Sequence, residues 1–515
     1  MTEFYGGTNL MKKIILAALA LTTSLACASA LTLYPANGAT GAAYDAQLVV
    51  TFDSAAQITA ETKVEILDSN GNVVDTILAA DEVQNFADGA KVNVGAQLIR
   101  AEGNSVYITP HNGKILPSSS YSVNFEGAGE WKFETKAAPS LFADGATITV
   151  NNSIAQENSA DFHSIQGALD AAAASKGTYT ISLAAGTYYE LLHYNAESNI
   201  ILQGPKGNNR GDNCVIQYIN CNDLNAGQKE RVSFYFNASK ANLVIENVTL
   251  INAADGEKVY SSAVQYASGN AQAETIFFHN GKGHTLVANN ASFKGHQDTM
   301  QISGKCWFYN CYVEGDVDYV WGYVDVALFE NCDFNCVRYV KDRAYLFECR
   351  VGSKEEPLVP KGFVLYNSTV NVEERQTAFF ARRATAVEKA KIPYYDQCAI
   401  VNVKFKGPGN FNPMSYYVGK APQFEGDCTN VGWKSYNVNF DELKGTKPTK
   451  ETASKRYKDS AELNKKLYKA EYANRNLIMN RVYNKDTGKY ENDAKYAWDL
   501  NKVIAERGYK IKPVK

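Results

Sequence analysis

A short pattern recurs about every 20 residues through the second half of the chain, and it restricts the fold more than any other feature. Each copy has two or three apolar residues, then Asn or Glu, two variable positions and another apolar residue. The copies occupy residues 243–250, 286–293, 307–313, 328–334, 346–351, 364–370 and 400–405. No helical pattern of 10 to 15 residues separates them. Each repeat is therefore expected to form one coil of a right-handed parallel β-helix.

The Asn or Glu of each repeat is expected to stack on its counterpart in the next coil. These residues are Asn247, Asn290, Asn310, Asn331, Glu348 and Asn367, at steps of 43, 20, 21, 17 and 19 residues. The step of 43 corresponds to two coils. Stacked Asn side chains satisfy the backbone of turns, so we interpret this ladder as structural.

Two acidic motifs lie one repeat apart. Gln297-Asp298-Thr299 is followed by Asp316-Val317-Asp318, which places Asp318 20 residues after Asp298. In a β-helix both carboxylates would lie on one sheet, about one strand spacing of 4.8 Å apart. Two acids that close do not ionise independently, so one keeps a proton and the other stays charged. The spacing predicts an acid and a nucleophile.

The beginning of the chain has the form of an export signal. Met11-Lys12-Lys13 precedes an apolar run over residues 14–21, and Ala28-Ser29-Ala30 suits cleavage, so residues 1–30 are expected to be leader and signal peptide. The product is expected to be secreted or periplasmic, with a surface lipoprotein attached at Cys27 as the less favoured alternative. No later stretch is long and apolar enough to span a membrane.

Three further segments follow the leader. Residues 31–136 contain short strand-like runs separated by turns, and predict an antiparallel β-sandwich that resembles bacterial immunoglobulin-like modules. Residues 142–445 are assigned to the β-helix, and the amphipathic run at 162–174 to a helix that caps its open end. Residues 446–515 contain 18 Lys and Arg against 9 Asp and Glu. We expect them to form a basic, mainly helical segment, with one helix over 494–507.

Cysteine usage gives no sign of a metal site. Nine cysteines remain after the leader, an odd number, and their spacing lacks the Cys-x-x-Cys of zinc sites. We expect buried thiols in the core, with one or two bridges.

From about residue 143 to 437 the chain resembles the pectin methylesterases, which are right-handed β-helices. Ala185-Gly186-Thr187-Tyr188-Tyr189-Glu190, Gln297-Asp298-Thr299, the run at 315–322 and Phe379-Phe380-Ala381-Arg382 are similar to family motifs and come in the family's order. The resemblance implies hydrolysis of methyl esters on the galacturonates of pectin, with release of methanol. The implied partner is pectin, or homogalacturonan. No cofactor, nucleic acid or membrane span is implied, and a monomer is expected.

The resemblance also implies roles for individual residues. Asp318 would be the nucleophile, Asp298 the acid and base, and Gln297 an oxyanion donor. Arg382 would hold Asp318 ionised.

The chain departs from the family's pattern at two positions. Ser262 stands where the family has a second oxyanion Gln, and Ala384 replaces an aromatic of the sugar cleft. His296, Tyr319 and Trp321 are the candidates to complete the substrate site. Three alternatives stay open: an esterase of another polysaccharide, a β-helix polysaccharide lyase, and a non-catalytic sugar-binding solenoid.

Overall fold

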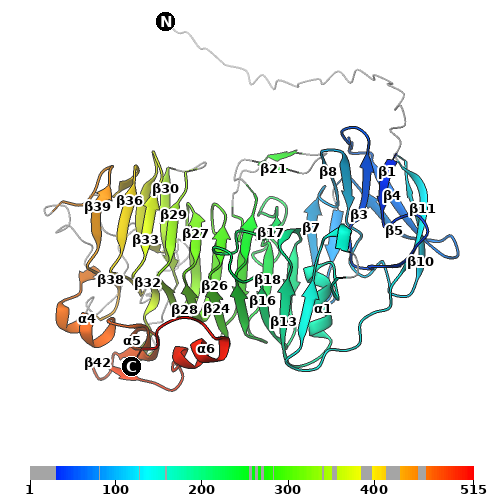
Figure 1. Ribbon diagram of the computed structural model, residues 1–515. Helices are drawn as coiled ribbons and strands as arrows, with labels where there is room; N and C mark the ends of the chain where they lie inside the picture. The colour runs from blue at the N-terminus through cyan, green and yellow to red at the C-terminus, as the bar shows by residue number, and fades with distance from the viewer. Residues whose placement is uncertain are drawn as a thin grey trace, which may run out of the picture.

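The computed structural model describes residues 30–514 apart from residues 81, 127, 157–158, 255–257, 261–264, 268–271, 282, 339–341, 351–355, 384–396, 413–429 and 450–459. The regular structure is mostly β-strand. A long stack of parallel strands forms the body, a smaller β-unit lies at one end, and the C-terminal helices lie along one side (Figure 1). The expected right-handed parallel β-helix is confirmed.

Two long parallel sheets build the β-helix. The larger sheet is ordered β12 (Thr147–Val150), β13 (Thr178–Leu183), β15 (Leu192–Tyr194), β16 (Asn199–Gln203), β18 (Phe234–Asn237), β19 (Leu243–Glu246), β23 (Ile276–His279), β24 (Thr285–Asn289), β26 (Met300–Tyr309), β28 (Val320–Glu330), β30 (Arg343–Cys349), β32 (Gly362–Tyr366), β34 (Thr377–Arg383), β35 (Cys398–Val401), β37 (Asn410–Phe411), β38 (Trp433–Tyr436) and β40 (Ser460–Glu462). The second is ordered β14 (Gly186–Tyr189), β17 (Cys214–Tyr218), β20 (Thr249–Asn252), β25 (Ser292–Lys294), β27 (Tyr312–Gly315), β29 (Asp333–Cys336), β33 (Thr369–Val372), β36 (Lys404–Gly407) and β39 (Asn439–Leu443). The larger sheet thus extends to β40, beyond the boundary at residue 445 drawn from the sequence.

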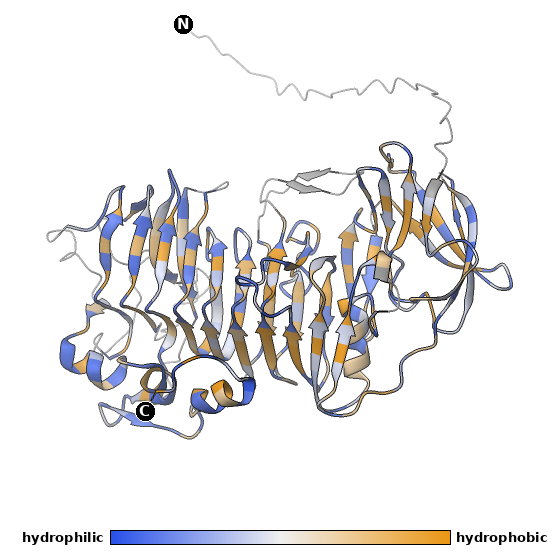
Figure 2. Ribbon diagram, viewed as in Figure 1, coloured by the Kyte–Doolittle hydropathy of each residue, from blue (hydrophilic) through white to orange (hydrophobic). Residues whose placement is uncertain are grey.

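The inward residues of both sheets fill a continuous apolar core. Like residues stack on like in successive coils, and the rings of Phe308 and Phe329 lie parallel with centroids 4.3 Å apart. Hydrophobic residues accordingly concentrate along the strands of the stack (Figure 2). Burial of this apolar surface is the main source of stability in a fold whose coils contact only their neighbours.

The repeat residues occupy one sharp turn in each coil. Asn247, Asn290, Asn310, Asn331, Asn367, Asn402 and Asn437 all have φ between 50° and 56°, a left-handed conformation that Asn tolerates well. Their amides also bond along the stack: Asn290 Nδ2 donates to Asn247 Oδ1 at 2.8 Å, and Asn310 Nδ2 to Asn290 Oδ1 at 3.1 Å. The structural interpretation of the ladder is confirmed for these residues.

One residue assigned to the ladder does not belong to it. Glu330 pairs with Tyr366, so Asn331 stacks on Asn367, 36 residues further on. Glu348 lies instead beside Trp321, at the other end of the long strand β28. The coil between them is longer than the repeat suggested, because β30 is an additional strand.

The N-terminal unit consists of two main sheets and a hairpin. One sheet is ordered β1 (Ala30–Tyr34), β3 (Leu48–Phe52), β9 (Ser105–Ile108) and β8 (Ile99–Glu102), and the other β2 (Ala39–Ala42), β11 (Gly129–Thr135), β10 (Ser120–Phe125), β4 (Lys63–Asp68) and β5 (Val73–Leu78). The hairpin is β6 (Glu82–Asn85) and β7 (Lys91–Gly95). The pairings are antiparallel except that β2 runs parallel to β11. The two main sheets share an apolar core, which includes the buried Trp131.

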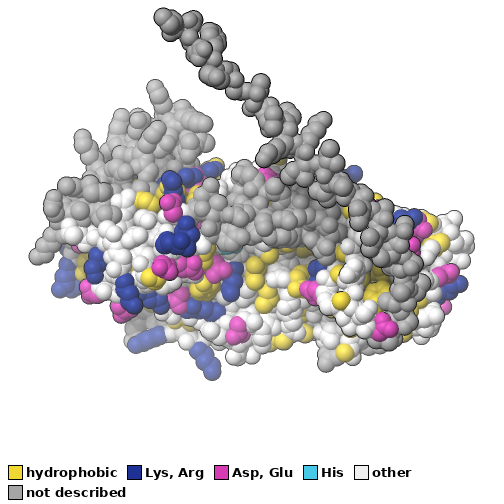
Figure 3. All heavy atoms as spheres, turned by 90° about the horizontal axis from the view of Figure 1, so that it is seen from above, with side chains coloured by type: hydrophobic (Ala, Val, Ile, Leu, Met, Phe, Trp, Pro, Cys, Tyr) yellow, Lys and Arg dark blue, Asp and Glu magenta, His cyan; other side chains and the backbone are white. Residues whose placement is uncertain are grey.

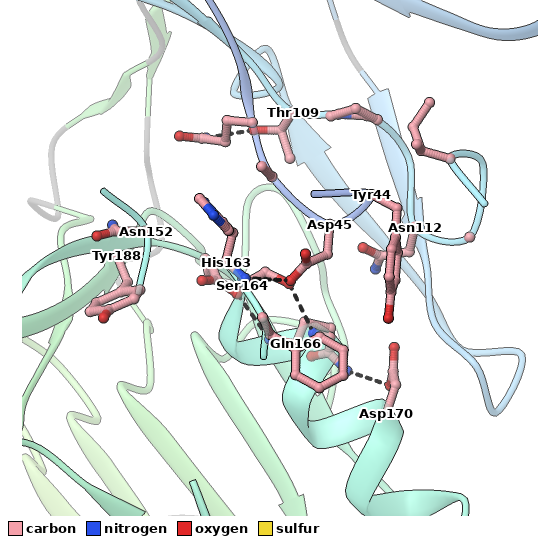
Figure 4. Close-up of a pocket in the computed structure, with 18 of the residues that line it drawn as sticks. Tyr44, Asp45, Thr109, Asn112, Asn152, His163, Ser164, Gln166, Asp170 and Tyr188 are labelled. Atoms are coloured by element: carbon pink, nitrogen blue, oxygen red, sulfur yellow. Dashed lines mark hydrogen bonds between the residues drawn. The ribbon is translucent and has the colours of Figure 1, made fainter. Parts of the chain in front are cut away.

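Helix α1 (Ile165–Ala173) covers the first coils and joins the two units. Ile165, Ala168, Leu169 and Ala172 are buried against the β-helix. Ser164 caps the helix by accepting from Gly167 N at 3.0 Å, and Asp45 of the N-terminal unit accepts from His163 N and Ser164 N at 2.8 Å each (Figure 4). A cavity of about 870 Å³ lies at this junction, and none of the expected site residues lines it.

The C-terminal segment packs on the outside of the larger sheet. Its helices are α4 (Lys465–Glu471), α5 (Arg475–Asn480) and α6 (Leu500–Arg507), and β41 (Arg481–Asn484) pairs with β42 (Lys489–Asn492) and β31 (Leu358–Val359). Leu463, Tyr472, Ile478, Met479, Leu500 and Ile504 share an apolar cluster with outward residues of the sheet. The helices expected in this segment are present as three short ones, which a hairpin and irregular chain separate. The helix expected over 494–507 begins only at Leu500, where Asp499 caps it.

Two ion pairs, one buried and one partly buried, anchor this segment. Arg475 donates to both oxygens of Glu330 at 2.8 Å, and Arg507 to both oxygens of Glu246 at 2.8 and 2.9 Å. Part of the basic charge of the segment is therefore neutralised inside the fold. On the face shown in Figure 3, Lys and Arg side chains gather over the C-terminal half and are sparse over the middle.

The cysteines of the described residues are buried in or near the core, and no disulfide joins the eight that the structure describes. The bridges expected among them are absent from this part of the chain, and Cys428 lies outside the described residues. No helix in the described ranges has the length and apolar character needed to cross a membrane.

Candidate active site

Asp298 and Asp318 occupy equivalent positions in successive coils. Met300 pairs with Val320 in the larger sheet, and Asp298 N donates to Val317 O at 2.9 Å. Both aspartates have positive φ, 63° and 53°, so each sits in a left-handed turn two residues before a strand begins. Both are also buried, at 4% and 3% exposure. The two aspartates therefore occupy equivalent backbone positions one coil apart, as the spacing predicted.

Asp318 is held by a guanidinium. Arg382, at the end of β34, forms an ion pair with Asp318 Oδ2, and the guanidinium also lies over the Tyr345 ring at 5.1 Å. The other carboxylate oxygen, Oδ1, is buried and accepts no hydrogen bond from the described residues. Burial raises the pKa of Asp318 well above its usual range, and the nearby Glu348 carboxylate raises it further, while Arg382 and Arg350 oppose both effects.

Asp298 shares its guanidinium with another carboxylate. Arg231 Nη2 lies 3.2 Å from Asp298 Oδ2, and the same nitrogen donates to Glu274 Oε1 at 2.5 Å. The Nε of Arg231 also donates to Glu274, at 2.8 Å to Oε2. Burial raises the pKa of Asp298 well above its usual range, Glu274 and Asp318 add to the rise, and Arg231 opposes it.

Arg231 has no donor left for another ligand. Its Nη1 donates to Asn222 Oδ1 at 3.1 Å and to Gln272 Oε1 at 2.7 Å, so its five N–H groups are all accounted for. The side chain is 4% exposed. Arg231 is therefore a fixed internal group.

A second glutamate lies beside Asp318. Glu348 Oε2 pairs with Arg350 Nη2 at 3.0 Å, and Glu348 Oε1 lies 3.7 Å from Arg382 Nη2. Arg350 in turn stacks over the Trp321 ring at 4.5 Å and donates to the Tyr323 hydroxyl at 3.1 Å. Tyr323 is 51% exposed, so this group reaches from the buried aspartate to the surface.

The charges of this cluster explain which aspartate holds a proton. Its four carboxylates are Glu274, Asp298, Asp318 and Glu348, and its three guanidiniums are Arg231, Arg350 and Arg382. With every group ionised the net charge is 3 − 4 = −1, which a buried site lowers by binding one proton. Asp298 is the carboxylate without a guanidinium of its own, since Arg231 is held mainly by Glu274. The charge distribution therefore favours the proton on Asp298 and the negative charge on Asp318, beside Arg382.

The other predicted residues have mixed outcomes. Gln297 is partly exposed next to Asp298, and its carbonyl accepts from Ala273 N at 3.2 Å. His296 is also partly exposed, and its carbonyl accepts from Asp316 N at 2.9 Å. Ser262 and Ala384 lie outside the described residues.

The two aromatic candidates are not open to a ligand in the way that was expected. Tyr319 is fully buried in the core with its hydroxyl 3.6 Å from Cys336 Sγ, so its assignment to the sugar site was wrong. Its ring belongs to the apolar core of the β-helix, on the inner side of the coil. Trp321 is 2% exposed and lies beneath Arg350. Tyr323, two residues further along β28, is the aromatic that reaches the surface.

Sequence reasoning missed Glu274, Arg231, Glu348 and Arg350. A signal for Glu274 exists: Glu274-Thr275-Ile276 repeats the acid, Thr and apolar order of Asp298-Thr299-Met300, and Ile276 pairs with Met300 in the sheet. Glu348 was assigned to the Asn ladder. No sequence pattern marks Arg231, which lies 43 residues before Glu274 and meets it only through the coil register.

Comparison with known proteins shows which family part of this chain is similar to. Residues 151–389 match the model of the family described as pectinesterase. The pectinesterase of Ralstonia solanacearum is 27% identical over 245 residues, 43% of this chain and 59% of that protein. The probable pectinesterase A of Aspergillus niger is 28% identical over 176 residues, 33% of this chain and 48% of that protein. The chain thus spans about half to three fifths of the length of these relatives.

The solved structures that the chain matches have lower sequence identity. The pectin methylesterase PemA from Erwinia chrysanthemi is 17% identical, with a TM-score of 0.46, and the match covers 65% of this chain and 97% of that one. A pectin methylesterase crystallised with a hexasaccharide is 18% identical, with a TM-score of 0.48 and the same coverage. By the family model and the sequence relatives, residues 151–389 are similar to the pectinesterase family.

Proposed function

We propose that the protein hydrolyses methyl esters on the galacturonates of pectin, releasing methanol and leaving a free carboxylate. One observation carries the proposal: Asp298 and Asp318 stack in successive left-handed turns, buried together, with Asp318 paired to Arg382 and Asp298 lacking a guanidinium of its own. This is an ionised nucleophile beside a protonated acid, as ester hydrolysis through a carboxylate requires.

The first half of the reaction forms an acyl-enzyme. A carboxylate oxygen of Asp318 attacks the ester carbonyl carbon, and the electron pair of the C=O bond moves onto oxygen. Gln297 donates to that oxyanion from the coil of Asp298. As the tetrahedral intermediate collapses, the bond to the methoxy oxygen breaks and Asp298 gives it a proton, so methanol leaves. The products are a mixed anhydride on Asp318 and an ionised Asp298.

The second half returns the enzyme to its starting state. Asp298, now a base, takes a proton from water as the water oxygen attacks the anhydride carbonyl. The bond to Asp318 breaks, Asp318 leaves as a carboxylate, and the sugar acid is released. Arg382 stabilises Asp318 as nucleophile and as leaving group, because an adjacent guanidinium favours the charged form.

A second candidate is an esterase of the same mechanism on a different polysaccharide. The charge of the cluster favours it, because its four carboxylates outnumber its three guanidiniums and give a net charge of −1 when every group is ionised. An acidic site disfavours a chain that already carries free carboxylates, since like charges repel. A neutral polysaccharide that carries ester groups would not meet this repulsion.

The decisive test is methanol release from highly methylated pectin, with and without a chelator, beside acetate release from an acetylated neutral polysaccharide. The proposal expects methanol release in both conditions and its loss in Asp318→Asn. Asp333→Asn is the matched control, because it makes the same change on the opposite side of the coil, where Asp333 pairs with Arg210. Release of acetate but not methanol would favour the second candidate.

The cellular setting is also proposed. The signal-like residues 11–30 support a secreted or periplasmic protein, and we propose that it acts on extracellular pectin as a monomer. Fractionation of the producing cells, with methanol release measured in each fraction, tests this location. Activity confined to the cytoplasm would contradict it.

A further inference from the structure

Glu274 is a fully buried carboxylate that the proposed reaction does not use. Its side chain is 0% exposed, and Arg231 contacts both of its oxygens. Its backbone is equally fixed, since Ser233 N donates to Glu274 O at 2.9 Å and Thr275 N to Thr299 O at 2.7 Å. A buried ion pair is costly to desolvate and often contributes little net stability, so its place beside a catalytic pair calls for another explanation.

The geometry ties Glu274 to Asp298 through a single nitrogen. Arg231 Nη2 donates to Glu274 at 2.5 Å and to Asp298 at 3.2 Å, so the shorter bond goes to Glu274. The Nε edge of the guanidinium also faces Glu274, and Nη1 is bound to Asn222 and Gln272. Arg231 therefore cannot turn toward Asp298 while Glu274 is charged.

We propose that Glu274 is a positioning residue for Asp298: by occupying Arg231, it keeps Asp298 the carboxyl that carries the proton needed for the leaving methanol. The proposal rests on the function proposed above. Glu274 acts in two ways, and both favour the protonated form of Asp298. Its charge repels a second negative charge on Asp298, and its hold on Arg231 removes the cation that would otherwise stabilise that charge.

The other charged groups around Asp298 do not compete for Arg231, so the positioning role falls to Glu274. Asp318 and Glu348 lie on the far side and raise the pKa of Asp298. Arg382 and Arg350 are committed to those two carboxylates. Arg231 is the guanidinium within hydrogen-bond distance of Asp298, and Glu274 is the group that competes for it. His296, two residues before Asp298, is partly exposed.

The test compares the pH dependence of kcat in Glu274→Gln and Glu348→Gln. Removal of the Glu274 charge frees Arg231 for Asp298, so Asp298 loses its proton at lower pH. The alkaline limb of the profile is expected to move down by about 1–3 pH units, with KM changed less than about twofold. Glu348→Gln removes a charge beside Asp318 instead, so the acidic limb should move down and activity at neutral pH should persist.

A double variant separates positioning from a structural role. In Glu274→Gln/Arg231→Met both charges are gone, and Asp298 again has no guanidinium within bonding distance. The alkaline limb should return toward its wild-type position, whereas a purely structural pair predicts a further loss of kcat without movement of either limb. Glu274→Asp keeps the charge and should shift the alkaline limb less than Glu274→Gln does. If Glu274→Gln does not fold, the shift in Glu274→Asp distinguishes a positioning role from a structural one.

A spectroscopic measurement makes the result independent of the substrate. The infrared carbonyl band of a protonated carboxyl, present in wild type and absent from Asp298→Asn, reports the proton on Asp298 directly. In Glu274→Gln this band should disappear at lower pH than in wild type, even if pectin proves not to be the substrate. An unchanged midpoint for the band, or an unmoved alkaline limb, overturns the proposal, while absence of methanol release with a shifted band overturns only the proposed function.

Discussion

The Asn ladder and the aspartate pair share one backbone conformation, the left-handed turn. In the ladder this turn supports a stable stack, and in the aspartate pair it brings two mutually repelling carboxylates together. Asn290 and Asn310 lie in left-handed turns of successive coils, as Asp298 and Asp318 do. An amide both donates and accepts, so each Asn satisfies the next, and the stack continues without strain. A carboxylate only accepts, so two stacked aspartates repel unless a proton or a guanidinium intervenes. Replacement of an amide by a carboxylate thus turns a structural stack into a reactive one.

The largest expected effect comes from Asp318→Asn, which makes the site resemble the ladder. An amide is not a nucleophile, so kcat for ester hydrolysis should fall by about 10⁴-fold or more. Binding of de-esterified pectin and the melting temperature should change little, because Asn tolerates the left-handed turn. Initial-rate measurements and a binding isotherm check both expectations. Turnover within tenfold of wild type would show that Asp318 is not the nucleophile.

Asp298→Asn should have a smaller effect on the rate. The nucleophile remains, but methanol must leave without a proton donor, and general acid–base help contributes about 10²–10⁴-fold. A substrate with a better leaving group than methanol needs less protonation and should recover part of the loss. The check is therefore kcat for a methyl ester and for an activated ester of the same sugar acid. An equal loss on both esters would contradict the acid role.

The reverse exchange, Asn290→Asp, tests the ladder. Asn290 Nδ2 donates to Asn247 Oδ1 and to Asn208 O, and a carboxylate would face both acceptors without a hydrogen to give. We expect a loss of about 1–3 kcal/mol in the free energy of unfolding, with kcat per folded molecule unchanged. Asn402→Asp is the matched control, because its ladder bonds are exposed and water can solvate the charge. Equal losses in both variants would mean that burial plays no part.

Much of the fold could be predicted because each repeat needs one left-handed turn in its backbone, and this need restricts the residue type at that position. Only a few residue types tolerate a left-handed turn, so Asn marked the bend of most coils and the coil period followed. The same rule placed Asp298 and Asp318 together. The period misplaced Glu348, because the additional strand β30 lengthens one coil. An inserted segment about as long as one repeat leaves the apparent period unchanged, so the sequence does not reveal it.

The rest of the site depends on information that a local pattern does not carry. Arg231 meets Glu274 and Asp298 across two coils, and the contact is fixed by how many residues each loop contains. Tyr319 was misplaced because it was chosen for its closeness to Asp318 in the sequence, which does not give the direction of the side chain, and this ring packs in the core. Side-chain direction can be read by period two only where the backbone stays extended.

The smallest expected effect is on the free energy of unfolding. It should depend on pH for the aspartate pair and not for the Asn ladder. The folded pKa of Asp298 is raised well above its usual range, chiefly by burial. Below about pH 4, the ordinary range of Asp, the carboxyl is protonated in both the folded and the unfolded chain and costs nothing. As pH rises further, the unfolded chain ionises while the folded protein keeps its proton, so the wild type loses stability until pH passes the folded pKa.

Asp298→Asn removes this loss. The variant should therefore match wild type near pH 4 and exceed it by about 0.5–2 kcal/mol at pH 8, in exchange for its lost activity. Urea unfolding at the two pH values measures the difference, and the ladder variant Asn290→Asp should show no such gain at either pH. The free energy of unfolding of Asp298→Asn could instead differ from that of wild type by the same amount at pH 4 and pH 8. That result would mean that ionisation of Asp298 does not destabilise the folded protein. The aspartate pair would then be a stack as relaxed as the ladder, and the proton on Asp298 would need another cause.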